Sequence, residues 1–182
     1  KKVFTLIGRL EYRKGQDLAV DAILKLPKEE LAKGYFIFVG KSYYTEAYQK
    51  IVKLCEKYPE NALYIEELSR DKIRQLYSQI DCLMCTSRDD PMPIVVTEAL
   101  MLSKAVICSE NTGSAALISQ ENAGIVYTDN SVEQLTQCIL RVLRDDGIEE
   151  LKANARNIYD KYFSEQVFMF LSPFCSLQAF LL

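Results

Sequence analysis

Short apolar runs rich in β-branched and aromatic residues alternate along this chain with longer segments in which apolar residues recur at helical spacing. The first pattern is typical of buried strands and the second of amphipathic helices. The strands predicted in this way are 3–7, 35–39, 62–65, 81–86, 105–108 and 124–127. The predicted helices are 15–26, 45–58, 70–79, 93–102, 115–119, 132–144 and 148–162. Because strands and helices alternate, we expect an α/β fold with one doubly wound, six-stranded parallel sheet and helices on both faces.

Residues at the predicted helix starts agree with this pattern. Ser69 and Ser131 directly precede two helices, where a serine side chain accepts a hydrogen bond from a free backbone N–H group. Pro93 is expected in the first turn of its helix, where its missing N–H group is harmless. Local and global signals therefore favour the same fold.

Length and composition limit what kind of protein this is. The chain has 182 residues, 49% of them hydrophobic, which suits one buried core and leaves no room for a second full-sized domain. The net charge of -3, with cations scattered among acids, argues against nucleic-acid binding. No apolar run is long enough to span a bilayer. The chain starts at Lys1 and enters a strand at once, as an excerpt from a longer protein would.

We expect one domain over residues 1–163 and an apolar tail over 164–182. The tail is interrupted by Pro173 and lacks a clean amphipathic pattern. Packing against another domain, contacts in a dimer, and a disordered or artificial chain end all stay open for it.

The histidine and cysteine content excludes several kinds of site. With no histidine in the chain, a Ser-His or Cys-His nucleophile and a histidine-bearing zinc site are excluded. The six cysteines lie mostly in apolar or amphipathic runs, which indicates reduced thiols in a cytoplasmic protein. Cys82 and Cys85 form a C-x-x-C within a predicted strand, where residues i and i+3 point to opposite faces. We therefore expect no redox or metal role for this pair.

Ligands of an open parallel sheet bind at the carboxyl ends of its strands, so the loops 8–14, 40–44, 66–69, 87–95 and 109–114 are the candidate site. In the first loop, Gly8 ends a strand, and Arg9 and Lys14 follow before a helix opens at Gly15. A guanidinium fork and an ammonium point charge are the donors expected around a diphosphate. Taken alone, this loop would favour a solvated turn over a diphosphate site.

The loop 87–95 leads from a buried strand into a helix that is apolar except at Thr97 and Glu98. The N-terminus of that helix would present free N–H groups and the positive end of a dipole to an anion. Glu98 follows an apolar stretch, where a carboxylate facing the crevice could accept hydrogen bonds from two sugar hydroxyls. For Asp90, helix capping or turn formation and a ligand role stay open.

Taken together, these residues resemble the retaining glycosyltransferases of group one, also called family four, which have the GT-B architecture. The residues that carry the resemblance are Gly8, Arg9, Lys14 and Gly15, similar to the family's GR…KG loop, and Asp90 and Glu98, similar to its two acids separated by seven residues. The segments 76–83 and 97–109 resemble the family's "LY…AD" and "EAMA…PVIAS". The resemblance extends from Val3 to about Phe163. It identifies the chain as the C-terminal, nucleotide-sugar-binding half of such an enzyme, with a Rossmann-like sheet.

The resemblance implies hexosyl transfer without a metal ion or other cofactor, in which cations and helix-end amides stabilise the departing nucleoside diphosphate. Arg9 and Lys14 would hold the diphosphate, while Asp90 would meet hydroxyls of the donor sugar. Glu98 would accept from the ribose hydroxyls. The residues expected in catalysis are Arg9, Lys14 and Asp90. The residues expected to bind the donor are Gly8, Arg9, Lys14, Gly40, Glu67, Leu68, Met92, Ile94, Val95 and Glu98, with Glu67 and Leu68 beside the base and the N–H groups of Ile94 and Val95 at the phosphates.

The implied partners are the nucleotide-sugar donor and an N-terminal acceptor-binding domain of the same protein, without which this half would turn over little. A polysaccharide or a lipid-linked molecule would be the acceptor. Nucleic acid is not an expected partner, and membrane contact would be peripheral at most. The thiols and the family indicate a cytoplasmic or membrane-peripheral location.

Two departures from the family pattern support a second hypothesis. The first acid is Asp90 where Glu is usual, and Pro91-Met92-Pro93 follows where Gly-Phe-Gly is common. Ala116 stands where the family has a later Glu. The alternative is a non-catalytic regulatory or assembly domain with a decayed donor pocket. A dinucleotide-binding domain is disfavoured, because the first strand is followed by Gly-Arg-Leu-Glu and not by G-x-G-x-x-G.

Overall fold

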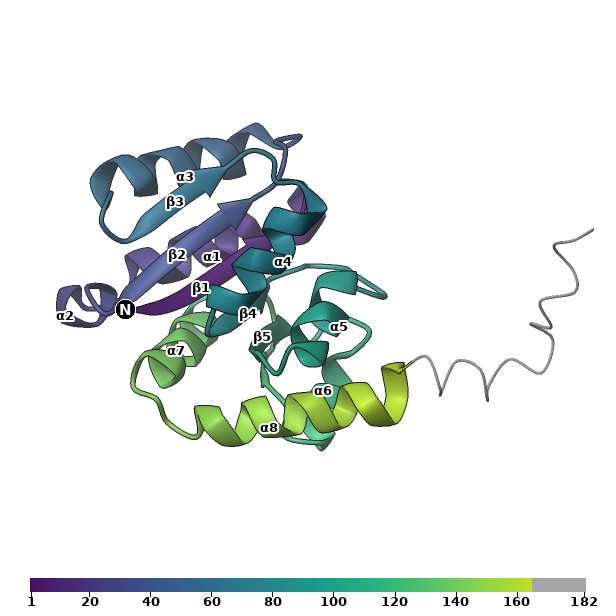
Figure 1. Cartoon of the computed structure of the whole chain (residues 1–182). Coiled ribbons are helices and arrows are strands. Elements are labelled where there is room, and N and C mark those ends of the chain that lie inside the picture. The colour runs from purple at the N-terminus through teal and green to yellow at the C-terminus, as the bar shows by residue number, and fades with distance from the viewer. Residues whose placement is uncertain (165–182) are drawn as a thin grey trace, which may run out of the picture.

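The computed structural model describes residues 1–164 and confirms the predicted α/β fold (Figure 1). Its sheet has six strands, all parallel, in the order β3-β2-β1-β4-β5-β6. The strands are β1 (Lys2–Ile7), β2 (Gly34–Val39), β3 (Ala62–Ile65), β4 (Cys82–Cys85), β5 (Ala105–Ser109) and β6 (Ile125–Tyr127). Every predicted strand is present, with its ends shifted by at most one residue. Beyond Ser164, the predicted tail lies outside the described residues.

The helices follow the predicted pattern with four local differences. They are α1 (Gln16–Leu24), α2 (Lys28–Leu31), α3 (Thr45–Lys57), α4 (Arg70–Gln79), α5 (Ile94–Met101), α6 (Ala115–Gln120), α7 (Val132–Leu143) and α8 (Ile148–Ile158). Helix α1 ends before its predicted end because Pro27 disfavours a helical residue ahead of it, and the short α2 after Pro27 was not predicted. Pro93 caps α5 from outside instead of lying in its first turn. The final predicted helix passes at Tyr159–Phe163 into a π-helical turn, η2.

The two predicted serine caps are confirmed. Ser69 Oγ accepts a hydrogen bond from the N–H group of Lys72 at the start of α4, and Ser131 Oγ accepts one from Gln134 at the start of α7. Each bond satisfies one of the N–H groups that a helix leaves free at its N-terminus.

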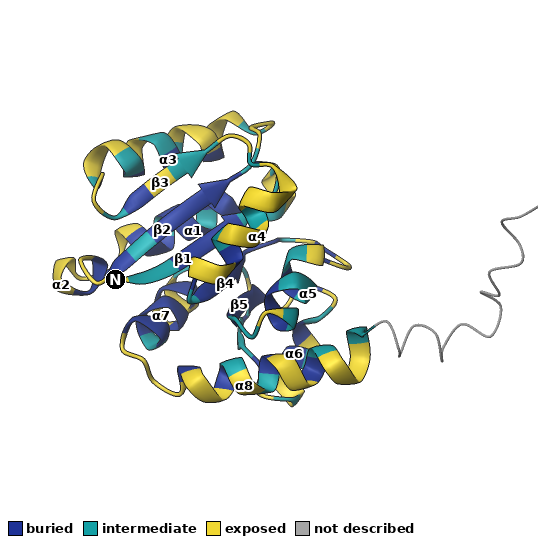
Figure 2. Cartoon of the chain, viewed as in Figure 1, coloured by how far each residue is buried: buried dark blue, intermediate teal, exposed yellow. Residues whose placement is uncertain are grey.

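The sheet separates two hydrophobic cores, and its strands are largely buried (Figure 2). Helices α1, α3 and α7 cover one face, and α4, α5 and α6 cover the other, while α8 contributes to both cores. Successive side chains of strand β4 point alternately into the two cores. Cys82 and Met84 lie in the first core, and Leu83 and Cys85 lie in the second. The two cysteines therefore point to opposite faces, as predicted, and both are free thiols.

The strand register places the carboxyl ends of neighbouring strands side by side. Ile7 of β1 lies opposite Val39 of β2, which lies opposite Ile65 of β3. At the centre of the sheet, β1 pairs with β4 only through Phe4↔Cys82 and Thr5↔Leu83. The winding of the sheet reverses between these two strands, and in such folds that is where ligands bind.

Candidate functional site

A cleft runs along the carboxyl ends of the strands, and Ile7 lies in each of its three adjoining parts. One part is lined by Gly8, Arg9, Gly40, Lys41, Tyr43, Glu66, Glu67 and Leu68. The middle part includes Ile73, Tyr77, Ile94, Val95 and Glu98. The third part includes Lys14, Gln16, Ser87 and Asp90, and shares Val95 with the middle. All residues predicted for catalysis and donor binding line this cleft, with the exception of Met92.

Lys14 and Asp90 form an ion pair across the cleft, between the loop after β1 and the loop after β4. The Asp90 side chain is only 8% exposed. Its backbone is held by the loop after β5, because Asp90 N donates to the Asn111 carbonyl at 3.2 Å and Gly113 N donates to the Asp90 carbonyl at 3.0 Å. A buried carboxylate is stable as an anion only with such a partner.

Backbone geometry explains why Gly15 follows Lys14. Gly15 has a φ of +65°, and a Cβ atom built on it would lie 2.0 Å from the Thr86 carbonyl oxygen. The Thr86 hydroxyl lies 3.1 Å from the Lys14 carbonyl and 2.9 Å from the Gly15 carbonyl. This contact holds the loop that carries Lys14 against the end of β4.

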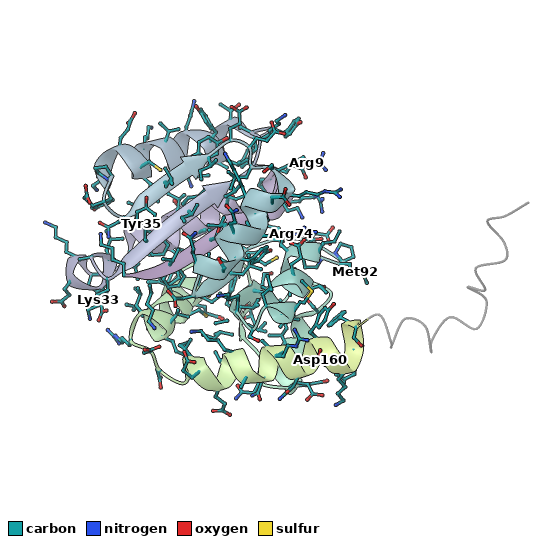
Figure 3. All side chains as sticks on the ribbon, in the orientation of Figure 1. Arg9, Lys33, Tyr35, Arg74, Met92 and Asp160 are labelled. Carbon is teal, nitrogen blue, oxygen red and sulfur yellow. The ribbon has the colours of Figure 1, made fainter. Side chains whose placement is uncertain are left out.

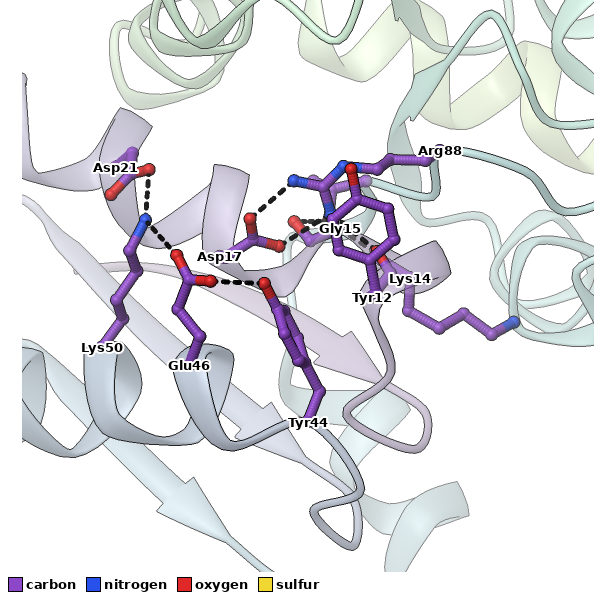
Figure 4. A network of polar contacts seen from close by, with 10 residues as sticks. Tyr12, Lys14, Gly15, Asp17, Asp21, Tyr44, Glu46, Lys50 and Arg88 are labelled. Atoms are coloured by element: carbon purple, nitrogen blue, oxygen red, sulfur yellow. Dashed lines mark hydrogen bonds and ion pairs between the residues drawn. The ribbon is translucent and has the colours of Figure 1, made fainter.

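A second contact between these loops was not expected from the sequence. Arg88 donates from Nη1 and Nη2 to the two carboxylate oxygens of Asp17, at 2.9 and 2.6 Å (Figure 4). Nη1 also lies 2.6 Å from the Tyr12 carbonyl oxygen, and the guanidinium stacks 4.2 Å from the centre of the Tyr12 ring. The hydrogen bond to Asp17 raises the pKa of Arg88. Nothing in sequence spacing connects Asp17 with Arg88, although Arg88 does stand two residues before Asp90.

Glu98 is oriented by Tyr77, which also lay outside the predicted site residues. The Tyr77 hydroxyl lies 3.0 Å from Glu98 Oε2 and 3.1 Å from the Val95 carbonyl, so its single hydrogen is shared between two acceptors. Burial, followed by the charge of Glu98, raises the pKa of Tyr77 well above its ordinary value. Glu98 therefore presents a carboxylate held in one direction at the middle of the cleft.

The first helical turn of α5 adds backbone donors to the cleft. Ile94 and Val95 occupy its first two positions, where N–H groups have no partner within the helix. The positive end of the helix dipole lies at the same place. Lys14, these N–H groups and the dipole together favour an anion here.

Arg9 lies at a different part of the cleft from Lys14, at its exposed rim (Figure 3). Its side chain is 63% exposed, and Nε lies 3.1 Å from Glu11 Oε1. The Gln16 amide nitrogen donates to the Arg9 carbonyl at 2.9 Å, which fixes the backbone, while the guanidinium stays at the surface. The structure therefore does not bring Arg9 and Lys14 into one cluster.

The remaining predicted residues lie at the ends of the cleft. Glu67 is exposed and pairs with Lys41 at 3.0 Å, which raises the pKa of Lys41. Gly40 has a φ of +148°, and a Cβ atom there would lie 2.0 Å from the Gly8 carbonyl oxygen, so the two loops meet through glycine. Met92 is 74% exposed and lines a separate pocket with Pro91, Pro93, Leu117 and Phe163.

Within residues 1–164, no three histidine, cysteine, aspartate or glutamate side chains gather as metal ligands would. In the same part of the chain, no helix is long and apolar enough to cross a membrane.

The fold and the cleft are those of a ligand-binding α/β domain, and comparison with known proteins identifies its family. Residues 1–161 match the model of glycosyl transferases group 1, so the chain belongs to this family. It is 28% identical over 143 residues to a glycogen synthase of Thermodesulfovibrio yellowstonii, a match that covers 78% of this chain and 28% of that protein. The chain spans less than half the length of the curated relatives it matches.

Two solved structures share the fold. HepE of Anabaena in complex with UDP and glucose has a TM-score of 0.75 at 23% identity, with 93% of this chain and 48% of HepE covered. The C-terminal domain of a group 1 family protein, LpcC of Francisella tularensis, has a TM-score of 0.76 at 19% identity. In that comparison, 91% of this chain and 88% of the LpcC domain are covered.

Proposed function

We propose that this chain is the C-terminal, donor-binding domain of a retaining family-four glycosyltransferase that acts without a metal ion. The observation that carries the proposal is the cleft in which Lys14, Asp90, the first turn of α5 and Glu98 lie along one edge of the sheet. The C-terminal placement is supported by the LpcC comparison, in which 91% of this chain and 88% of the LpcC C-terminal domain are covered. HepE of Anabaena has been solved in complex with UDP and glucose and in complex with UDP-glucose, which supports a uridine nucleotide as the first ligand to test.

In this proposal, the third part of the cleft receives the diphosphate. The Lys14 ammonium and the N–H groups of Ile94 and Val95 donate to phosphate oxygens, and the α5 dipole adds a fixed positive potential. Negative charge grows on the diphosphate as its bond to the sugar breaks, so these groups bind the transition state more tightly than the ground state. Arg9 would join them from the rim, since its exposed side chain can turn toward a bound phosphate.

Asp90 and Glu98 give the donor its orientation. Asp90 would share the Lys14 ammonium with the phosphates and accept from a hydroxyl of the sugar. Glu98, held by Tyr77 at 3.0 Å, would accept from the ribose hydroxyls. Glu67 and Leu68 would lie beside the base, and Gly8 and Gly40 would leave room for the backbone to approach the ligand.

The acceptor would be held by an N-terminal domain, as a polysaccharide or a lipid-linked molecule. Both kinds of acceptor are proposed because the relatives include a glycogen synthase and an alpha-galactosylglucosyldiacylglycerol synthase. The five cysteines of the described residues are free thiols, and burial raises the pKa of Cys108 to about 12. Such inert thiols support a cytoplasmic or membrane-peripheral location.

One observation favours the alternative, a non-catalytic domain of the same fold. Ala116 is exposed at the start of α6, so the loop after β5 supplies no carboxylate at that position. The two hypotheses differ in whether the chain binds a nucleoside diphosphate.

The test is calorimetry of the folded chain with UDP, GDP, dTDP and CDP, with Glu98→Gln as the key variant. Replacing the carboxylate by an amide keeps the shape and removes a charge-assisted acceptor, so we expect affinity to fall by more than about 1 kcal/mol. Glu133→Gln, an exposed carboxylate on α7, is the matched control and leaves affinity unchanged. Failure of wild-type protein to bind any of the four nucleotides, or equal binding by Glu98→Gln, would overturn the donor-site proposal.

A further inference from the structure

The loop that carries Asp90 is joined to the start of α1, just after Lys14, by an ion pair that has no role in the function proposed above. Asp17 stands three residues after Lys14, and Arg88 stands two residues before Asp90. The Arg88 and Asp17 side chains are 17% and 7% exposed, and they meet as a two-pronged fork. Removing two charges from water is costly, so a buried pair of this kind fixes geometry more than it adds stability.

Backbone hydrogen bonds also join the two loops next to this ion pair. Arg88 N donates to the Arg13 carbonyl at 2.7 Å, next to the contact of Thr86 with Lys14 and Gly15. Arg88 is therefore joined to the loop after β1 through its backbone, its guanidinium fork and its contact with the Tyr12 carbonyl. These contacts hold the backbones of the two loops together close to Lys14 and Asp90.

The pair is also supported from the side of α3. The Tyr12 ring, which covers the guanidinium, meets the Tyr44 ring edge-on at a centroid distance of 5.7 Å. The Tyr44 hydroxyl donates to Glu46 at 2.6 Å, and Lys50 links Glu46 with Asp21 of α1 (Figure 4). This chain of contacts reaches from the loop after β4 to two helices and holds Tyr12 over the ion pair.

We propose that Arg88 and Asp17 are positioning residues of the donor site, whose ion pair fixes the distance between the Lys14 ammonium and the Asp90 carboxylate. The inference rests on the proposed function for the ligand, although the fixed distance itself does not depend on any ligand. Lysine cannot replace Arg88, because a single ammonium cannot form the fork, reach the Tyr12 carbonyl and stack on the ring at once.

The test uses Arg88→Lys in the full chain, with Arg144→Lys as its matched control. Arg144 also pairs with a largely buried carboxylate, through one contact of its Nε with Glu30 Oε1 at 3.1 Å, and neither residue lines the cleft. The first measurement is the NMR chemical shift of Lys14 Nζ and of the Asp90 carboxyl carbon. The second is UDP affinity by calorimetry. We expect Arg88→Lys to change both shifts and to weaken UDP at least about tenfold, since a small misplacement of a charged contact is costly, while Arg144→Lys does neither.

Asp17→Asn supplies a second, isosteric variant and should produce the same two changes. The double variant Arg88→Lys with Asp17→Asn should bind UDP about as weakly as either single variant, because both changes break the same pair. A lower melting temperature with unchanged shifts and unchanged UDP affinity would make the pair merely structural and overturn the proposal. If the shifts change but wild-type protein binds no nucleotide, the proposed function fails and the positioning role stands.

Discussion

The contact between Tyr77 and Glu98 gives a prediction whose size follows from the structure. Tyr77→Phe keeps the buried ring and removes the hydroxyl that lies 3.0 Å from Glu98 Oε2. A hydrogen bond to a charged group contributes about 1.5–3 kcal/mol. Glu98 is half-buried, so water replaces part of the lost donor, and we expect a loss of about 1–2 kcal/mol in unfolding free energy. For a domain of this size, the melting temperature should fall by roughly 2–8 °C.

The same substitution should weaken nucleotide binding. Without Tyr77, the Glu98 side chain moves freely before binding and must be immobilised by the ligand, which costs about 0.5–1.5 kcal/mol. We therefore expect UDP affinity to fall about two- to twelvefold, measured by calorimetry.

Tyr127→Phe is the control for this prediction. The Tyr127 hydroxyl is buried and has no hydrogen-bond partner among residues 1–164. Removing it should leave stability unchanged or raise it, since a buried hydroxyl without a partner is unfavourable. Wild-type melting temperature and UDP affinity in Tyr77→Phe, or an equal loss in Tyr127→Phe, would refute the assigned role of the Tyr77 hydroxyl.

Two further predictions concern backbone fit and pH. Gly8 and Gly40 have similar φ angles, but only a Cβ at Gly40 meets backbone, 2.0 Å from the Gly8 carbonyl oxygen. In urea unfolding, Gly40→Ala should therefore cost roughly 2–4 kcal/mol and Gly8→Ala about 1–2 kcal/mol, and equal costs would contradict the close approach. Hydrogen bonds from Lys33 and then Arg144 lower the pKa of Glu30 below its ordinary 4.5. Its stabilising contribution is complete above pH 4.5 and disappears as pH falls through the lower folded-state pKa. The urea midpoint of Glu30→Gln should accordingly depend less on pH in this acid range than that of wild type, and parallel curves would count against the ion pair.

The pattern of apolar runs predicted the sheet well because its central strands are largely buried on both faces. Strand β4, Cys-Leu-Met-Cys, contributes alternately to the two cores, which makes a continuous apolar run the expected signal. Helix α2 has only four residues and no room for a periodic pattern, so its absence from the prediction has a simple cause.

Residues of the candidate site could be predicted from the sequence where one loop contains the charged side chains. The sequence indicated Lys14, Asp90 and Glu98, and the structure adds that the first two are ion-paired and that Tyr77 holds the third. Arg88 and Asp17 could not be paired from sequence, because their contact depends on how the loops after β1 and β4 meet in space. Arg9 and Lys14 were expected to hold the diphosphate together, and the sequence could not show that their side chains line different parts of the cleft in the absence of a ligand.

The short pairing between β1 and β4 divides the domain into two three-stranded halves joined along a narrow seam. The strand ladder covers only Phe4↔Cys82 and Thr5↔Leu83. Toward the cleft, the halves are connected by side-chain contacts and by the backbone bond from Arg88 N to the Arg13 carbonyl. A molecule that contacts Lys14 in one half and Asp90 in the other bridges this seam. Its binding free energy then opposes any local opening in which the halves separate. Hydrogen exchange should consequently slow in both central strands on binding, although the first core already joins residues of both halves, such as Phe4 and Ile107.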